Sequence, residues 1–76
     1  MAATRVKGPE PDFAELDLVQ LRSTIYDRGH SFRVGTIGTV LFRHPGGEAF
    51  EVEFASPLPA VMTLRPWDLA DVNVRP

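Results

Sequence analysis

The alternation of large apolar and acidic residues in the middle of the chain is the feature that most constrains the fold. Phe50, Val52 and Phe54 alternate there with Glu51 and Glu53. Successive side chains of a strand point to opposite faces of its sheet, so this pattern predicts a strand with one buried and one solvated face. The centre of the chain must therefore belong to a sheet that packs three large apolar side chains on one side.

A second strand is predicted directly before this one. Residues 36–43 read Thr-Ile-Gly-Thr-Val-Leu-Phe-Arg, and β-branched and apolar residues of this kind favour strands. Gly38 inside the strand indicates a bulge or a close approach of another backbone. The sequence His-Pro-Gly-Gly at residues 44–47 is a strong turn signal. The two strands are therefore expected to form an antiparallel hairpin over residues 36–55.

The rest of the chain supplies short strands separated by irregular connections. Strands are expected at residues 17–22, 60–64 and 71–74. Residues 23–35 form a long irregular connection, and a loop of that length in so small a domain is often functional. Residues 66–69 predict a 3₁₀-like turn, because the leading proline sets the direction in which the chain enters it.

These elements predict one all-β domain, a small five-stranded SH3-like barrel over residues 13–76. Five short strands, a long first loop and a helical turn before the last strand are the layout of that fold. Closure into a barrel would bury both the apolar face and the sheet edges. An OB-like barrel is the competing fold, but it needs a helix between its third and fourth strands, where this chain has Ser-Pro-Leu-Pro. Residues 1–12 are broken by prolines and are expected to form a flexible or extended N-terminal tail.

Three segments of the chain resemble a family of small bacterial proteins that is known only as a domain of unknown function. They are Val-Gly-Thr-Ile-Gly-Thr-Val-Leu at 34–41, Gly-Glu-Ala-Phe-Glu-Val-Glu-Phe at 47–54 and Val-Met-Thr-Leu at 61–64, followed by Leu69. The family pattern is similar: Gly-Asp-x-Gly-Thr-Val-Val, Tyr-Glu-Val-Glu-Phe, Val-Thr-Leu and a closing Leu-x-x-Val. The resemblance covers about residues 17–74 and implies an SH3-like fold with no established activity.

The same skeleton of glycines and valines is similar to that of other small barrels. These are the photosystem I accessory subunit, the variable chain of ferredoxin–thioredoxin reductase, and the nitrile hydratase β-subunit and its activator. All of them act by docking to a protein partner. The family places a polar and then an apolar residue where this chain has Phe42 and Arg43. Either the strand register shifts there at a bulge, or Phe42 faces solvent.

Composition narrows the classes of protein further. A chain of 76 residues that is 43% hydrophobic suits one small globular domain. It contains no cysteine, so neither a disulfide nor a thiolate metal site stabilises it. The net charge of −2 argues against binding to nucleic acid or to an anionic membrane. Without a signal-like start or a run of roughly 18 apolar residues, we expect a cytoplasmic protein that does not contact membranes.

No group of residues in the sequence predicts catalysis, a cofactor or a metal. His30 and His44 do not have the ligand spacing of a zinc site. Glu51 and Glu53 share the solvated side of one strand, and acid–base catalysis would require a pocket that perturbs one of them. The glycines of residues 35–39 lack the lysine and the following helix of a phosphate loop. We therefore expect a protein that is not an enzyme and has no cofactor.

Five residues are the candidate contacts for a partner: Tyr26, Arg28, Phe32, Phe42 and Trp67. Tryptophan, tyrosine and arginine are enriched at interface hot spots. The first loop and the 3₁₀-like turn, which hold most of these residues, are neighbours in SH3-like barrels. The sequence leaves open whether Trp67 is a contact residue or a plug of the core.

A protein-interaction module is the function that these features favour. It would be an accessory subunit, or a small neutralising partner, of a larger bacterial protein encoded by a neighbouring gene. A homodimer is a further option, because a thin core and exposed edges favour self-association. Two alternatives stay open: a barrel that binds single-stranded nucleic acid through arginine and aromatic side chains, and an accessory or activator subunit of a metal or electron-transfer enzyme.

Overall fold

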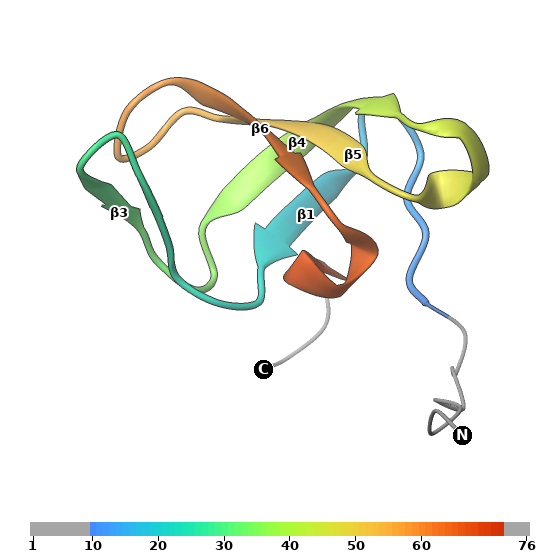
Figure 1. The fold of residues 1–76 in the computed structure, drawn as a ribbon, viewed down its shortest axis with the longest axis horizontal. Coiled ribbons are helices and arrows are strands. Elements are labelled where there is room, and N and C mark those ends of the chain that lie inside the picture. The colour runs from blue at the N-terminus through green and yellow to red at the C-terminus, as the bar shows by residue number, and fades with distance from the viewer. Residues whose placement is uncertain (1–9, 73–76) are drawn as a thin grey trace, which may run out of the picture.

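The central hairpin of the fold follows directly from the local sequence. A computed structural model of the chain describes residues 10–72, and Figure 1 shows their arrangement. β4 (Ile37–Arg43) and β5 (Phe50–Phe54) pair antiparallel, joined by the 3₁₀ turn η1 (Pro45–Gly47). Phe50, Val52 and Phe54 are fully buried. The prediction of a hairpin with its three large apolar side chains facing inward is therefore confirmed.

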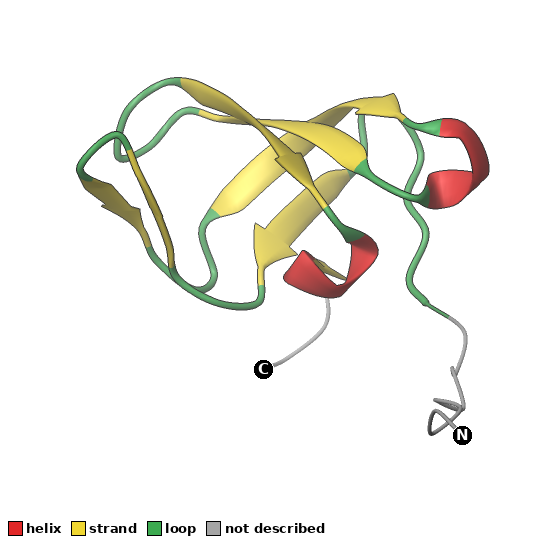
Figure 2. Cartoon of the chain, in the orientation of Figure 1, coloured by secondary structure: helices red, strands yellow, loops and turns green. Residues whose placement is uncertain are grey.

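The remaining regular structure consists of short strands and one further turn (Figure 2). These elements are β1 (Leu18–Leu21), β2 (Ile25–Asp27), β3 (His30–Phe32), β6 (Ala60–Leu64), the 3₁₀ turn η2 (Pro66–Asp68) and β7 (Leu69–Asp71). Five strands form one sheet in the order β6-β5-β4-β1-β7, and β2 and β3 form a second, two-stranded sheet. All pairs are antiparallel, so the all-β prediction is confirmed.

Two expected boundaries are corrected by the structure. The connection at residues 23–35 is not irregular throughout, because it contains the β2–β3 hairpin. Arg28 and Gly29, the two residues at its tip, have φ angles of 51° and 77°. A two-residue hairpin turn of this kind requires positive φ at both positions. Arginine rarely adopts that conformation, so the turn has no clear signal in the sequence. The last strand also begins earlier than expected, at Leu69 directly after η2; residues 73–74 lie outside the described part of the chain.

The five-stranded sheet is curled but not closed. Its edges are β6 and β7, and no ladder joins them within residues 10–72, so the prediction of a closed barrel is wrong. Only residues 65–68 connect these two edges along the chain. A flat sheet of five strands would be roughly 19 Å wide, whereas a 3₁₀ turn rises only about 2 Å per residue. The short connection therefore requires the sheet to curl around its inner face.

The inner face of the curled sheet holds the core. Its largest fully buried side chains come from several strands: Val19 and Leu21 from β1, Phe32 from β3, Val40 from β4, Phe50, Val52 and Phe54 from β5, and Leu69 from β7. The Phe32 ring packs on Phe54 with centroids 5.8 Å apart. A Cβ atom built on Gly38 would lie 2.7 Å from a Val52 methyl carbon and 2.9 Å from the Glu53 carbonyl oxygen. Gly38 thus marks a close backbone approach, one of the two features predicted for it.

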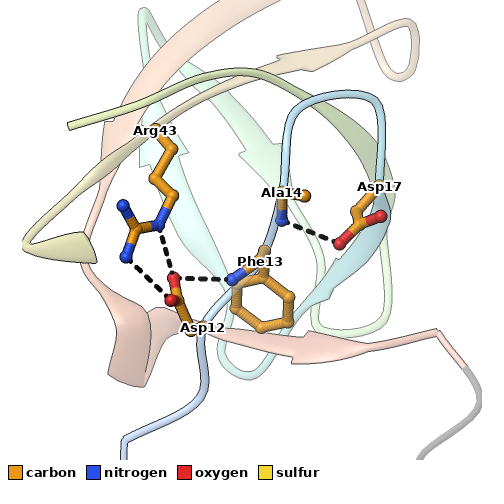
Figure 3. A network of polar contacts seen from close by, with 5 residues as sticks. All are labelled: Asp12, Phe13, Ala14, Asp17 and Arg43. Atoms are coloured by element: carbon orange, nitrogen blue, oxygen red, sulfur yellow. Dashed lines mark hydrogen bonds and ion pairs between the residues drawn. The ribbon is translucent and has the colours of Figure 1, made fainter. Parts of the chain in front are cut away.

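The segment before β1 is attached to the sheet by a buried ring and an ion pair (Figure 3), and by backbone hydrogen bonds that Leu16 and Asp17 form with Val40. Phe13 is buried and meets Phe50 edge-on, with ring centroids 5.4 Å apart. Beside it, Arg43 Nε and Nη2 donate to the two Asp12 carboxylate oxygens at 2.9 and 2.8 Å. These hydrogen bonds hold the pKa of Asp12 below its ordinary value. Residues 1–9 of the expected tail lie outside the described residues.

Candidate functional site

The outward side of the five-stranded sheet carries an unusual number of exposed apolar side chains. We call this surface the outer face, and its apolar members are Leu18 (55% exposed), Ile37 (53%), Leu41 (41%), Phe42 (47%) and Val61 (53%). A solvated sheet face is normally polar. Apolar side chains that gather on one exposed face mark a site of interaction more often than scattered ones do.

The strand register places Leu18, Ile37 and Val61 on the same side of the sheet. Leu18 lies opposite Thr39, Thr39 opposite Glu53, and Glu53 opposite Val61, so these four residues form one row across β1, β4, β5 and β6. Ile37 lies on the same side of β4 as Thr39, two residues away. Directly opposed residues of neighbouring strands have Cβ atoms roughly 5 Å apart. The outer face is therefore a continuous surface.

A β-bulge adds two consecutive apolar residues to this surface. The register of β4 against β5 shifts between Val40, which lies opposite Val52, and Phe42, which lies opposite Glu51. Leu41 is the extra residue, and both Leu41 and Phe42 are exposed. With strict alternation, one of these two side chains would point inward. The bulge lets both of them point outward. The two interpretations of Phe42, a shift of register and exposure to solvent, are thus both correct.

A polar network borders the apolar residues near η1. His44 Nε2 lies 2.6 Å from Glu51 Oε2, and the Thr63 hydroxyl donates to the same carboxylate at 2.8 Å. The hydrogen bond from His44, and then that from Thr63, lower the pKa of Glu51 below its ordinary value. The Phe42 ring meets the His44 ring edge-on, with centroids 5.1 Å apart. This network orients Phe42 and leaves Glu53 as the acidic group of the outer face with no partner among the described residues.

The structure separates the five residues that the sequence singled out. Phe42 lies on the outer face, while Tyr26 in β2 and Trp67 in η2 are exposed elsewhere. Because the Trp67 side chain is exposed, it is not a plug of the core. Phe32 is fully buried against Phe54, so its selection as a contact residue is corrected: it belongs to the core. The hairpin that contains Tyr26 and the turn η2 do not lie side by side in Figure 1.

Several arginine side chains already bond to acceptors within the described residues. Arg28 forms an ion pair with Asp27 at 3.1 Å, and Arg43 with Asp12 at 2.8 Å. Arg65 Nη1 donates to the Glu48 carbonyl oxygen at 3.4 Å. Arg28, chosen as a contact residue, is thus already bonded to a carboxylate. Residues 10–72 contain no group of three histidine, aspartate or glutamate residues placed to hold a metal ion, and no helix long and apolar enough to cross a membrane.

Four residues of the outer face were not predicted from the sequence: Leu18, Ile37, Leu41 and Val61. Each was assigned to a strand, but no side was assigned to it. The available signal was the failure of alternation in residues 37–42, where apolar residues occupy both sides of one strand. A strand of that kind needs either burial on both faces or a partner on the second face.

No family model, no curated protein and no solved structure matches this chain. The resemblance to a family of small bacterial proteins therefore stays a prediction. The function is inferred instead from the geometry of the surface itself.

Proposed function

We propose that this protein is a non-enzymatic protein-interaction module that binds a larger protein through the outer face. The observation that carries the proposal is that Leu18, Ile37, Leu41 and Phe42 are all exposed on the solvent side of β1 and β4. If these four side chains were buried on the inner side, they would stabilise the fold. Because they are exposed on the outer side, they contribute little to its stability. Burial against a partner gives them a physical role.

An SH3-like arrangement of the strands is part of the same proposal. The order β6-β5-β4-β1-β7, the β2–β3 hairpin after the first strand and η2 before the last strand support this assignment. The small barrels that the sequence resembles dock to larger proteins as accessory subunits. We accordingly propose an accessory subunit or a small neutralising partner as the role of this chain. The ion pairs of Arg28 and Arg43 reduce the positive charge that nucleic acid would require.

A mixing experiment tests the proposal. The chain is combined with the protein encoded by the neighbouring gene, and size-exclusion chromatography reports whether the two elute together. We expect a complex with the unmodified chain, and a complex at least roughly tenfold weaker with Ile37→Glu, because a carboxylate in the centre of a desolvated contact is costly.

Val34→Glu is the matched control. Val34 is 56% exposed, close to the 53% of Ile37, but it lies in the connection before β4 and not on the outer face. The control variant should bind as the unmodified chain does. Two proteins that always elute separately, or equal weakening by both variants, would overturn the proposal.

A further inference from the structure

We propose that β6 accepts an extended segment of the partner as an additional strand, and that this segment carries lysine or arginine on the side that continues the outer face. The proposal rests on the protein-binding function proposed above and names the chemistry of the partner. Three observations support it: the open edge of β6, the unpaired carboxylate of Glu53, and the charge that a second copy of the chain would bring.

The edge of β6 lacks the features that usually protect a sheet edge. On one side β6 pairs with β5 in unbroken register from Leu64↔Phe50 to Ala60↔Phe54, and no other described strand pairs with it. Its sequence, Ala-Val-Met-Thr-Leu, contains neither a charge nor a proline. Proteins normally protect edges with charges, prolines, bulges or very short strands. An uncharged, regular edge of five residues is a template for strand addition.

The other edge of the sheet is different. β7 has only three residues and ends at Asp71. Gln20 Nε2 on β1 donates to the Asp71 carbonyl oxygen at 2.9 Å. A short strand of this kind gives an incoming segment few backbone groups to bind. Strand addition is therefore assigned to β6.

Acidic groups lie where the added strand would place its outward side chains. Glu53 is opposite Val61 and makes no ion pair within the described residues. A shallow groove of about 510 Å³ at this end of β6 is lined by Asp27, Arg28, Glu53, Pro59, Ala60 and Val61. Because Arg28 is paired with Asp27, Glu53 is the uncompensated charge of the groove. An added strand would lie roughly 10 Å from β5, a distance that lysine or arginine spans by laying its stem over Val61.

A second copy of the chain is disfavoured as the occupant by the same charges. If two β6 strands paired antiparallel around Met62, Val61 would lie opposite Thr63 of the second copy. The next residue in that row is Glu51 of the second copy, because Glu51 lies opposite Thr63. Each copy would thus bring the Glu51 carboxylate, which His44 and Thr63 already bond, toward the row that contains Glu53, and that row itself contains no lysine or arginine. A basic segment of another protein satisfies the charge that self-association leaves unpaired.

Synthetic peptides test the proposal even while the partner is unidentified. The probe is acetyl-Thr-Lys-Val-Lys-Val-Lys-Thr-amide, titrated into the full isotope-labelled chain at low salt while amide resonances are followed by NMR. We expect saturable shifts centred on Val61, Met62 and Thr63, and affinity that falls as salt is added. The same peptide with glutamate in place of lysine should bind at least about tenfold more weakly. A peptide N-methylated along the edge that would face β6 should not bind, because it lacks the backbone donors that would pair with β6.

Two variants of the protein complete the test. Glu53→Gln should lower the affinity for the lysine peptide roughly two- to fivefold, which is the range of a single exposed ion pair. Glu15→Gln is the matched control, since Glu15 is exposed in the turn before β1, across β4 from β5 and β6, and should leave the affinity unchanged. Equal binding of the lysine and glutamate peptides, absence of shifts in β6 at millimolar peptide, or a dimer in sedimentation whose interface maps to β6 would each overturn the proposal.

The outcome is separable from that of the proposed function. Peptide binding at β6 with no effect of Ile37→Glu on the protein complex would refute docking through the outer face and leave strand addition standing. A complex that is sensitive to Ile37→Glu, but is neither weakened by Glu53→Gln nor competed by the lysine peptide, would refute strand addition alone.

Discussion

The inner and outer faces of β4 and β5 are built from the same two strands but meet different environments. On the inner face Val40, Val52 and Phe54 are fully buried in the curl of the sheet. On the outer face Ile37 and Phe42 are equally apolar, yet roughly half of each side chain is exposed. Hydrophobicity alone therefore does not assign a residue to the core. The inner face stabilises the fold, and the outer face is available to a partner.

Truncation of one phenylalanine on each face is the sharpest test of this difference. Phe50→Ala removes a fully buried ring that Phe13 contacts, and should lower the free energy of unfolding by about 3–5 kcal/mol. That loss is comparable with the whole stability of a domain of this size, so the variant should be largely unfolded by circular dichroism. Phe42→Ala should lower the free energy of unfolding by less than about 1 kcal/mol. Equal losses in the two variants would erase the distinction between the faces.

A methyl group added at Gly38 probes how tightly the inner face is packed. The new Cβ of Gly38→Ala would lie 2.8 Å from a Phe54 ring carbon and 2.9 Å from the Glu53 carbonyl oxygen. A backbone oxygen cannot move aside as a flexible side chain does, so denaturant unfolding should show a loss of about 1–3 kcal/mol. Thr39→Ala is the control on the neighbouring, outward position and should have a smaller effect. A Gly38→Ala variant as stable as the unmodified protein would mean that the strands separate easily at this point.

The smallest expected effect concerns the polar border of the outer face. Hydrogen bonds from His44 and Thr63 lower the pKa of Glu51 in the folded state below its ordinary value of 4.5. The carboxylate therefore stabilises the fold above that pH, and its contribution is lost as pH falls through the lower, folded-state pKa. Glu51→Gln should reduce the free energy of unfolding at pH 7 by less than about 1 kcal/mol.

Unfolding curves at several pH values check this expectation. The stabilities of Glu51→Gln and the unmodified protein should converge as the pH is lowered below 4.5. Thr63→Val, which removes one of the two donors, should reduce the pH-dependent part of the difference. A gap between Glu51→Gln and the unmodified protein that grows on acidification would contradict the assigned direction of the pKa.

Local patterns predicted the elements that depend on local chemistry. Alternation at residues 50–54 identified β5 and its buried side, and the glycines after Pro45 identified the turn into it. The crowding at Gly38 was also expected, because glycine inside a strand indicates a close approach. These inferences hold because strand periodicity and turn conformation are properties of a few adjacent residues.

Predictions that required distant residues were less successful. Phe32 was chosen as a contact residue because it is aromatic and lies in the first loop, but the β2–β3 hairpin directs it against Phe54. The network of His44, Glu51 and Thr63 was not foreseen, because its members come from three separate segments. Closure of the barrel was expected because it would bury the apolar face and both sheet edges, whereas the pairing leaves β6 and β7 as edges.

Short stretches of sequence were enough to establish that this chain is all-β, where its central hairpin turns, and which side of β5 is buried, because a few adjacent residues encode each of those properties. Tertiary packing settled which apolar residues stay exposed, that a bulge turns both Leu41 and Phe42 outward, and that β6 ends the sheet as an open edge. Those outcomes depend on which strands become neighbours and how their registers align, and both are set by contacts between segments far apart in the chain.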